Sequence, residues 1–158
     1  GQLFFLHSNT HKTLLATREK ENKLAITAIH IKYNTGLNRV GFPLDEIQWV
    51  LEKIKLPQFK LESVYSHLAA SEEEQPSKHC LLQIARFEEL KKKHLEASQT
   101  KPNFHLLNSS GIFNYPEYQY DAVRCGIALH GYANKFEWDT QLKPVAVLKS
   151  KISQLHQV

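Results

Sequence analysis

Short apolar runs alternate along the chain with longer segments in which leucine and isoleucine recur every three or four residues. Several runs are continuously apolar, which is typical of strands that are buried on both faces of a sheet. The strands predicted in this way are residues 3–6, 28–33, 63–68, 104–107 and 122–129. Residues 44–54 and 77–96 are predicted to be helices, because their apolar positions share one face.

The order of these elements predicts their arrangement. Strand and helix follow one another with short connections, and this order forms parallel βαβ units. We therefore expect an α/β fold, namely a partial (β/α)8 barrel of the TIM type with about five parallel strands. A complete barrel needs eight strands and ~250 residues, whereas the chain has 158. Residues 72–76, which combine three glutamates with Gln and Pro, are predicted to form a surface loop.

Composition narrows the class of protein. With 42% hydrophobic and 23% charged residues, the chain suits one globular domain. No apolar run is long enough to span a bilayer and no secretory leader opens the chain, so we expect no membrane segment. Cys80 and Cys125 form neither a disulfide framework nor a metal-ligand spacing, so we expect a cytoplasmic protein without a metal. The net charge of +4 is dispersed apart from the lysines at 91–93 on a predicted helix face, so we expect no nucleic-acid partner.

Polar residues stand where four consecutive predicted strands end. They are Lys32 with Thr35, Gly36 and Arg39 beyond it, then His67, then Asn108 and Ser109, and finally Arg124, which lies within the last predicted strand. In a (β/α)8 barrel the residues at these strand ends line the active site. A single histidine or arginine here has an ordinary explanation, such as a core hydrogen bond or a surface ion pair. Because four strands share the pattern, we expect Lys32, His67, Asn108 and Arg124 to meet at one edge of the sheet.

Two short segments in this set have the properties of an anion site. The Ser-Ser-Gly sequence at 109–111 follows a predicted strand and opens a helix or turn, where hydroxyls and unpaired amides bind anions. Gly126 and Ile127 follow Arg124, and a glycine amide can approach an anion closely because it carries no side chain. Barrels of this type often bind phosphate with the loops after their last two strands. We therefore predict a phosphate-bearing cofactor.

Four stretches that contain these residues resemble alanine racemase, a pyridoxal-phosphate enzyme of fold type III. They are HIKYNTGLNRVGF at 30–42, YSHLA at 65–69, HLLNSSGI at 105–112 and DAVRCGIALHGY at 121–132. They occur in the order in which the family has them. A further stretch, LKPVAVLKSKI at 142–152, resembles the family's passage from the barrel into its C-terminal β-domain.

The resemblance implies a role for each matching residue. Those expected around the cofactor are His67, Asn108, Ser109, Arg124, Gly126 and Ile127. Arg124 resembles the arginine that donates to the pyridine nitrogen, which stays unprotonated because arginine keeps its proton. The ring is then a weaker electron sink, which suits proton exchange without decarboxylation or transamination. Arg39 resembles the arginine beside the substrate carboxylate, and Lys32 resembles a lysine that is often carbamylated and orients that arginine.

The chain departs from the family pattern at several positions. Asn34 stands where aspartate is common, Leu37 where methionine is common, Cys125 where proline is usual and His130 where tyrosine is usual. Leu37 is close in volume to methionine and is expected to matter little. Asn34 removes a charge beside Lys32 and Arg39, so it bears on their geometry.

The resemblance also divides the chain. Residues 1–141 are expected to be an incomplete pyridoxal-phosphate-binding barrel domain, and residues 142–158 the start of the connection to a C-terminal β-domain. The family's Schiff-base lysine and opposing tyrosine are expected outside this chain, so we expect no catalytic residue within it and no activity of it alone. The parent enzyme is expected to be a homodimer that interconverts L- and D-alanine with pyridoxal 5'-phosphate for peptidoglycan synthesis.

The same residues leave other functions open. A serine racemase or another amino-acid racemase of this family would differ only by a few atoms of the substrate pocket. A basic amino-acid decarboxylase is less favoured, because Arg124 opposes the electron sink that decarboxylation needs. From a different class, the alternatives are a non-catalytic module that binds pyridoxal phosphate or another phosphate, and a fragment without a function of its own.

Overall fold

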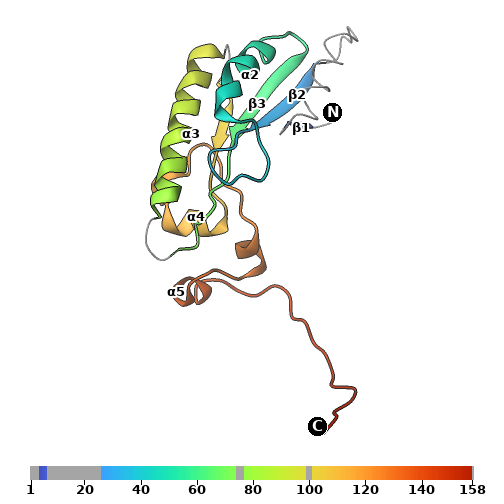
Figure 1. Cartoon of the computed structure of the whole chain (residues 1–158). Helices are drawn as coiled ribbons and strands as arrows, with labels where there is room; N and C mark the ends of the chain where they lie inside the picture. Colours follow the sequence, from blue (N-terminus) through green and yellow to red (C-terminus); the bar gives the residue numbers. More distant parts are fainter. Residues whose placement is uncertain (1–3, 7–25, 74–76, 99–100, 158) are drawn as a thin grey trace.

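The computed structural model describes residues 4–6, 26–73, 77–98 and 101–157. Within them, four parallel strands form one sheet in the order in which they occur along the chain. They are β1 (Phe4–Leu6), β2 (Thr27–Lys32), β3 (Phe59–Tyr65) and β4 (Asn103–His105). Figure 1 shows these strands beside the long helix that follows β3. The parallel order predicted from the alternation of strands and helices is therefore confirmed.

Two helical segments connect the strands and cover one face of the sheet (Figure 1). A 3-10 turn, η1 (Leu44–Glu46), and α2 (Ile47–Lys53) link β2 to β3, and α3 (Lys78–Ala97) links β3 to β4. The helices predicted at 44–54 and 77–96 are thus confirmed.

Alternation along β2 sorts its side chains between the two faces of the sheet. Ile29 and Ile31 belong to the core and are each 1% exposed, so His30 and Lys32 lie on the opposite face. Residues of α3 are buried at every third or fourth position, namely Cys80, Ile84, Phe87, Leu90 and His94. Each fully buried phenylalanine or isoleucine side chain contributes about 1.5–3 kcal/mol, so this helix–sheet interface is a main source of stability.

The strand predicted at residues 122–129 is wrong. A single β-bridge joins its first residue to His105, and the chain then forms a 3-10 helix, η3 (Ile127–His130). The backbone amides explain the difference. The amide of Gly126 and that of the second residue after it both donate to the Ser109 hydroxyl oxygen, at 2.8 and 3.3 Å, so they do not extend the ladder of β4.

Two other predictions touch residues outside the described ranges. These are residue 3 of the first predicted strand and residues 74–76 of the predicted loop. The described parts of both predictions agree with the structure, since β1 is a strand and residues 71–73 form a turn.

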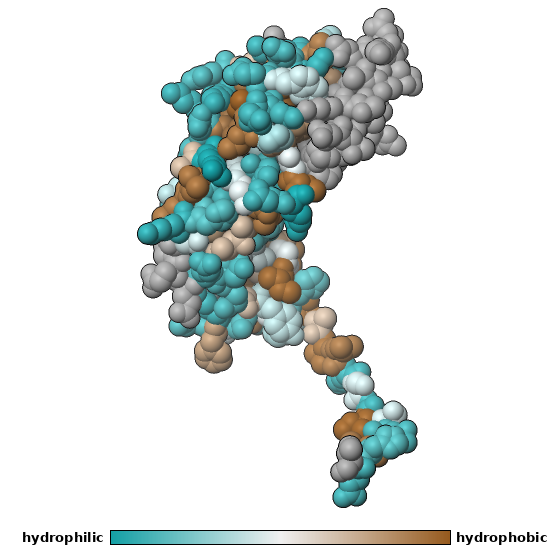
Figure 2. All heavy atoms as spheres, viewed as in Figure 1, coloured by the Kyte–Doolittle hydropathy of each residue, from teal (hydrophilic) through white to brown (hydrophobic). Residues whose placement is uncertain are grey.

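Beyond α4 (Ser109–Asn114) and α5 (Phe136–Asp139) the chain runs on in an extended, exposed conformation (Figure 1). Its apolar side chains are between 68% and 99% exposed and stand out in Figure 2; they are Val145, Val147, Leu148, Ile152 and Leu155. The start of this segment crosses Gly131, whose φ is +86° and where a Cβ would meet the Lys143 carbonyl and Pro144. Among the described residues, no helix is long and apolar enough to cross a membrane.

Candidate functional site

The residues predicted to meet at the carboxyl ends of the strands do so. Nη2 of Arg124 lies 3.1 Å from Nδ1 of His67, and Nε2 of His67 lies 3.4 Å from the Asn108 side-chain nitrogen. Lys32 is near this group because Lys32 and Arg124 both contact the ring of Tyr65. The Lys32 ammonium lies 5.9 Å from the centre of the Tyr65 ring, and the Arg124 guanidinium lies 5.1 Å from the same centre.

Backbone carbonyls fix the orientation of Arg124. Its Nη2 donates to the carbonyl oxygens of Ser66, at 2.6 Å, and Leu106, at 3.2 Å, and its Nη1 lies 3.3 Å from that of His105. These carbonyls lie at the ends of β3 and β4, so the guanidinium connects the two strands by hydrogen bonds. Burial lowers the pKa of Arg124, and the nearby Tyr65 opposes this. An arginine nevertheless remains protonated in proteins.

A directed chain of hydrogen bonds leads away from Arg124. Its Nη1 lies 2.5 Å from Nδ1 of His105, and since arginine can only donate, that nitrogen accepts. The other nitrogen of His105 then donates to the Ser63 hydroxyl at 3.1 Å, and this hydroxyl forms a hydrogen bond with Nδ1 of His30 at 2.6 Å. The neutral form of His105 that this requires agrees with its pKa of about 4, lowered by burial, then by Arg124 and His30.

His67 is also held in its neutral form. Its pKa is lowered to about 4 by burial first, and then by the positive charges of Arg124, Lys32 and Arg39. A neutral ring can accept the hydrogen bond from Arg124, as the contact requires. His67 is therefore a hydrogen-bond acceptor beside a permanent cation at neutral pH.

Lys32 and Arg39 bring further positive charge to the site. Lys32 is 5% exposed, and its pKa is lowered by burial and then by Arg39 and Arg124. Arg39 is exposed, in the loop after β2. Its positive charge contributes to the lowered pKa values of both Lys32 and His67.

Asn34 organises the loop that carries Arg39. Its side-chain oxygen accepts from the amides of Gly36, at 3.1 Å, and Asn38, at 3.0 Å. Its side-chain nitrogen donates to the Asn38 side-chain oxygen at 3.0 Å, which a carboxylate could not do. Asn38 has a φ of +57°, a conformation that asparagine tolerates better than most residues. The departure from the family pattern at Asn34 thus has a structural use.

Ser109 and Gly126 are brought together, as predicted, through the two amides that donate to the Ser109 oxygen. Asn108 caps α4, because its side-chain oxygen accepts from the Gly111 amide at 2.9 Å and from the Ser71 hydroxyl at 2.8 Å. Ile127 begins η3 with its side chain 56% exposed. The loops that follow β4 therefore present a hydroxyl and backbone amides beside Arg124.

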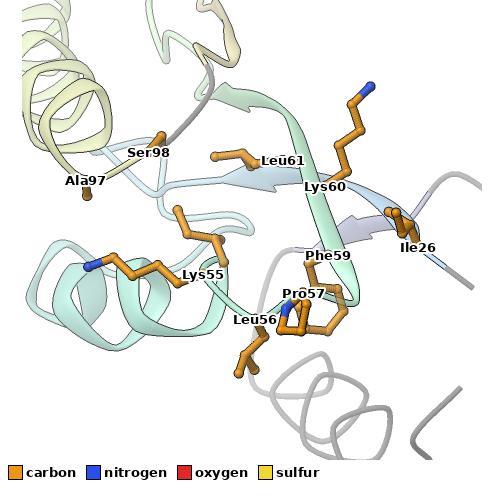
Figure 3. Close-up of a pocket in the computed structure, with 10 residues that line it drawn as sticks. Ile26, Lys55, Leu56, Pro57, Phe59, Lys60, Leu61, Ala97 and Ser98 are labelled. Carbon is orange, nitrogen blue, oxygen red and sulfur yellow. The ribbon is translucent and has the colours of Figure 1, made fainter. Parts of the chain in front are cut away.

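A hollow of about 290 Å³ lies at the other end of the strands (Figure 3). It is lined at the start of β2 and β3 by Ile26 and Phe59, together with Ile54, Leu56, Pro57, Leu61 and Ala97. Figure 3 shows the Lys60 side chain directed away from it. The polar residues gather at the opposite ends of the strands, so the site is placed there.

Several residues that build the site were not assigned a role from the sequence. Tyr65 stacks on His105 with ring centres 4.8 Å apart and lies beneath two cations. Ser63 and His30 complete the chain from Arg124. Tyr65 and His105 are each the first residue of a stretch that resembles the family, and this position was the sequence feature that could have indicated their roles. No sequence feature indicated a role for Ser63, because serine occurs inside strands for many structural reasons.

The charge at these strand ends is positive. The site combines three cations with neutral histidines, a hydroxyl and backbone amides. No group of three or more histidine, cysteine or acidic residues in the described part of the chain is arranged to hold a metal ion. These features define an α/β domain with a cluster of cationic and polar side chains at the carboxyl ends of its parallel strands.

Comparison with known proteins identifies the family. The model of the alanine racemase N-terminal domain matches residues 5–134. The chain is 36% identical over 154 residues to an alanine racemase of Carboxydothermus hydrogenoformans, covering 94% of this chain and 41% of that protein. It is 34% identical over 160 residues to alanine racemase 1 of Clostridium acetobutylicum, covering 96% of this chain and 39% of that protein. The chain therefore belongs to the alanine racemase family and corresponds to part of the N-terminal domain.

Solved structures show the same fold. Alanine racemase of Clostridium difficile 630, in complex with cycloserine, has a TM-score of 0.77 at 24% identity over 90% of this chain and 40% of its own. The enzyme of Streptomyces lavendulae has a TM-score of 0.76 at 20% identity, over 90% and 39%. The sheet and its helices are thus part of the α/β barrel domain, and the chain spans about two fifths of the length of its relatives.

Proposed function

We propose that the chain is part of an enzyme that uses pyridoxal 5'-phosphate to interconvert L- and D-alanine. The observation that supports this best is the Arg124 guanidinium, which backbone carbonyls hold beside neutral His67, with the Gly126 amide two residues later bonded to the Ser109 hydroxyl. Its relatives are named alanine racemases, which supports alanine as substrate.

The residues present fit this cofactor. The Ser109 oxygen already accepts from two amides, so its own hydrogen is the group left to donate to a phosphate oxygen. Ser109, Gly126, Ile127 and Asn108 would surround the phosphate, and Arg124 would donate to the pyridine nitrogen. When bound, the cofactor would supply a conjugated ring that withdraws electrons from the substrate α-carbon and makes its proton acidic.

Arg124 would favour racemisation over other reactions of this cofactor. An arginine does not give up its proton, so the ring nitrogen would remain unprotonated. Its carbonyl partners hold the guanidinium in one orientation, and His67 and His105 accept from it in their neutral forms. Arg124 and its neighbours would thus keep the electron withdrawal by the cofactor ring moderate. Moderate withdrawal suits proton exchange, because proton exchange needs less electron withdrawal than decarboxylation does.

Arg39 would bind the substrate carboxylate, and Lys32 would orient Arg39. The lowered pKa of Lys32 increases the share of neutral amine, which is the form that reacts with carbon dioxide to give a carbamate. A carbamylated Lys32 would exchange a positive charge for a negative one between Arg39 and Arg124. This would hold the two arginines in place by charge pairing.

The rest of the proposal concerns the whole enzyme. We place an incomplete barrel domain in residues 1–141 and the connection to a C-terminal β-domain in residues 142–158, supported by the exposed apolar side chains of that segment. We further propose that the whole enzyme is a cytoplasmic homodimer that supplies D-alanine for peptidoglycan; the names of its relatives support this proposal.

The test uses the full-length enzyme that contains this chain. The purified protein is expected to retain pyridoxal 5'-phosphate, seen by absorbance, and to convert L-alanine to D-alanine. Turnover of serine with no turnover of alanine would favour a serine racemase instead. Retention of the cofactor with no turnover of any amino acid would favour a non-catalytic binding module.

A further inference from the structure

A side chain of α3 joins two loops of the site from behind the sheet. Gln83 is 0% exposed, and its amide group is fully used. The nitrogen donates to the His67 carbonyl at 2.9 Å and to the Thr35 hydroxyl at 3.3 Å, and the oxygen accepts from the Ala69 amide at 2.9 Å. Gln83 therefore bonds the loop after β2 and the loop after β3 at once.

Two further residues of the same helix face hold the loop after β2. His79 and Arg86 lie four residues before and three residues after Gln83, so all three share one face. Nε2 of His79 donates to the Gly36 carbonyl at 3.1 Å, and Nη1 of Arg86 donates to the Thr35 carbonyl at 2.9 Å. A Cβ on Gly36 would lie 3.1 Å from the His79 ring, so the loop rests directly on α3.

Only one assignment of donors and acceptors satisfies these hydrogen bonds. The Ser66 hydroxyl donates to the Tyr33 carbonyl at 2.8 Å, so it accepts from Thr35, also at 2.8 Å. Thr35 then accepts from Gln83. The Ser66 carbonyl in turn accepts from Arg124 at 2.6 Å. A continuous path of bonds thus leads from α3 to the guanidinium at the centre of the site.

The loops that Gln83 joins carry Arg39 and His67. A leucine or methionine would fill the same space, and burying an amide is costly unless all its hydrogen bonds are made. Here each bond is made to a loop of the site and none to the helix itself. We propose that Gln83, supported by His79 and Arg86, is a positioning residue that sets Arg39 relative to His67 and so sets the affinity for the substrate carboxylate. This inference rests on the proposed function.

The experiment compares variants of the full-length, cofactor-loaded enzyme. Gln83→Met removes all three bonds at similar length, and Gln83→Glu keeps the acceptor for Ala69 but loses both donors. Ile84→Ala, next to it in the core and 3% exposed, is the control for lost stability. The readouts are Tm, cofactor Kd, KM and kcat for alanine, and the Kd of propionate, which is alanine without its amino group.

Gln83→Met is expected to raise the KM for alanine and the Kd of propionate about tenfold, the effect of one or two buried hydrogen bonds, with cofactor Kd changed less than about twofold. Ile84→Ala is expected to lower Tm without these changes. If Gln83→Met lowers Tm but leaves KM and propionate binding like those of the control, the residue only supports the fold and the inference fails.

A readout that needs no turnover separates this inference from the proposed function. In Gln83→Met the amides of Ala69 and Gly36 are expected to exchange hydrogen faster, whereas in Gln83→Glu the Ala69 amide stays protected. An inactive wild-type enzyme would overturn the proposed function, while unchanged exchange in Gln83→Met would overturn the positioning role. If Gln83→Met does not fold, two variants of Arg86 replace it. Arg86→Ala is expected to raise the KM for alanine, whereas Arg86→Lys, which keeps one donor for the Thr35 carbonyl, is expected to have a KM near that of the wild type. Equal KM values for the two Arg86 variants would contradict the inference.

Discussion

At the scale of residues, the two arginines of the site differ in how they are held. Arg124 is bound by backbone carbonyls, whereas Arg39 is exposed on a loop and acts on its neighbours through charge. A guanidinium fixed by carbonyls suits a ring atom that stays in place, and an exposed one suits a substrate that enters and leaves. The two roles assigned from the family resemblance are therefore compatible with their surroundings.

Arg39→Ala in the full-length enzyme is expected to impair substrate binding more than cofactor retention. A charge-assisted hydrogen bond is worth roughly 1.5–3 kcal/mol, so the KM for alanine should rise about tenfold to a hundredfold. Cofactor content by absorbance and turnover per bound cofactor are measured together. Loss of cofactor with unchanged turnover per bound cofactor would contradict the assignment. Lys60→Ala, on the exposed start of β3, is the control.

His94 makes the fold sensitive to acid. The Tyr33 hydroxyl and Nε2 of His94 form a hydrogen bond at 2.9 Å, and burial lowers the pKa of His94 from 6.5 to about 4. Between these pH values the unfolded state binds more protons than the folded state, so the free energy of unfolding falls as pH falls. The loss from this residue reaches at most about 3 kcal/mol by pH 4.

The measurement is Tm from pH 7 down to pH 4. His94→Gln keeps an acceptor for Tyr33 but cannot titrate, so its Tm is expected to fall less steeply with pH than that of the wild type. His67 and His105 contribute a similar slope in both proteins, since their pKa values are also about 4. His156→Gln, on the exposed C-terminal segment, should match the wild type. Parallel curves for His94→Gln and wild type would show that His94 does not carry the effect.

At the scale of elements, β2 is extended by a loop that returns to it. The Phe42 amide donates to the Lys32 carbonyl and the Asn34 amide donates to the Phe42 carbonyl, both at 2.8 Å. Gly41 makes this closure possible, because its φ is +133° and a Cβ there would lie 2.7 Å from the Asn34 amide nitrogen. The loop that carries Arg39 is thus anchored at both ends.

Gly41→Ala is expected to open this closure. The strained conformation and the close contact together cost about 1–3 kcal/mol or more, so Tm should fall and the KM for alanine should rise while cofactor content changes little. Val40→Ala, in the same loop without backbone strain, is the matched control. If Gly41→Ala has the KM of the control, the closure does not position Arg39.

The elements also show what the sequence could and could not reveal. Apolar runs and helical periodicity located β2, α2 and α3, because burial on both faces of a strand and on one face of a helix leaves a local pattern. The supposed strand at 122–129 had the same apolar content. What prevents it is the Ser109 hydroxyl, a side chain distant in sequence that takes two of its amides. The role of Gln83 was hidden for the same reason, since its partners belong to two loops far along the chain.

At the scale of the whole molecule, the parallel strands separate two ends with different character. Cations, histidines and amides lie at the carboxyl ends, whereas the hollow at the amino ends is lined mostly by apolar residues. The site residues were predictable because a parallel sheet delivers every strand end to the same edge. Their hydrogen-bond partners were not, because carbonyls and core hydroxyls carry no signature in the sequence.

The close contact of Gly131 with Lys143 and Pro144 has a consequence for which mutations the gene can accept. Any amino acid that replaces glycine adds a side chain, and even alanine would place a Cβ against the Lys143 carbonyl and Pro144. In a library of all single substitutions of the full-length gene, selected for D-alanine supply, every variant at Gly131 is expected to be depleted, while the exposed neighbour His130 tolerates exchange. Recovery of Gly131 variants at the frequency of His130 variants would show that this contact is dispensable. Depletion of all Gly131 variants would instead show that the path of the chain after Pro144 depends on a single position that accepts no side chain.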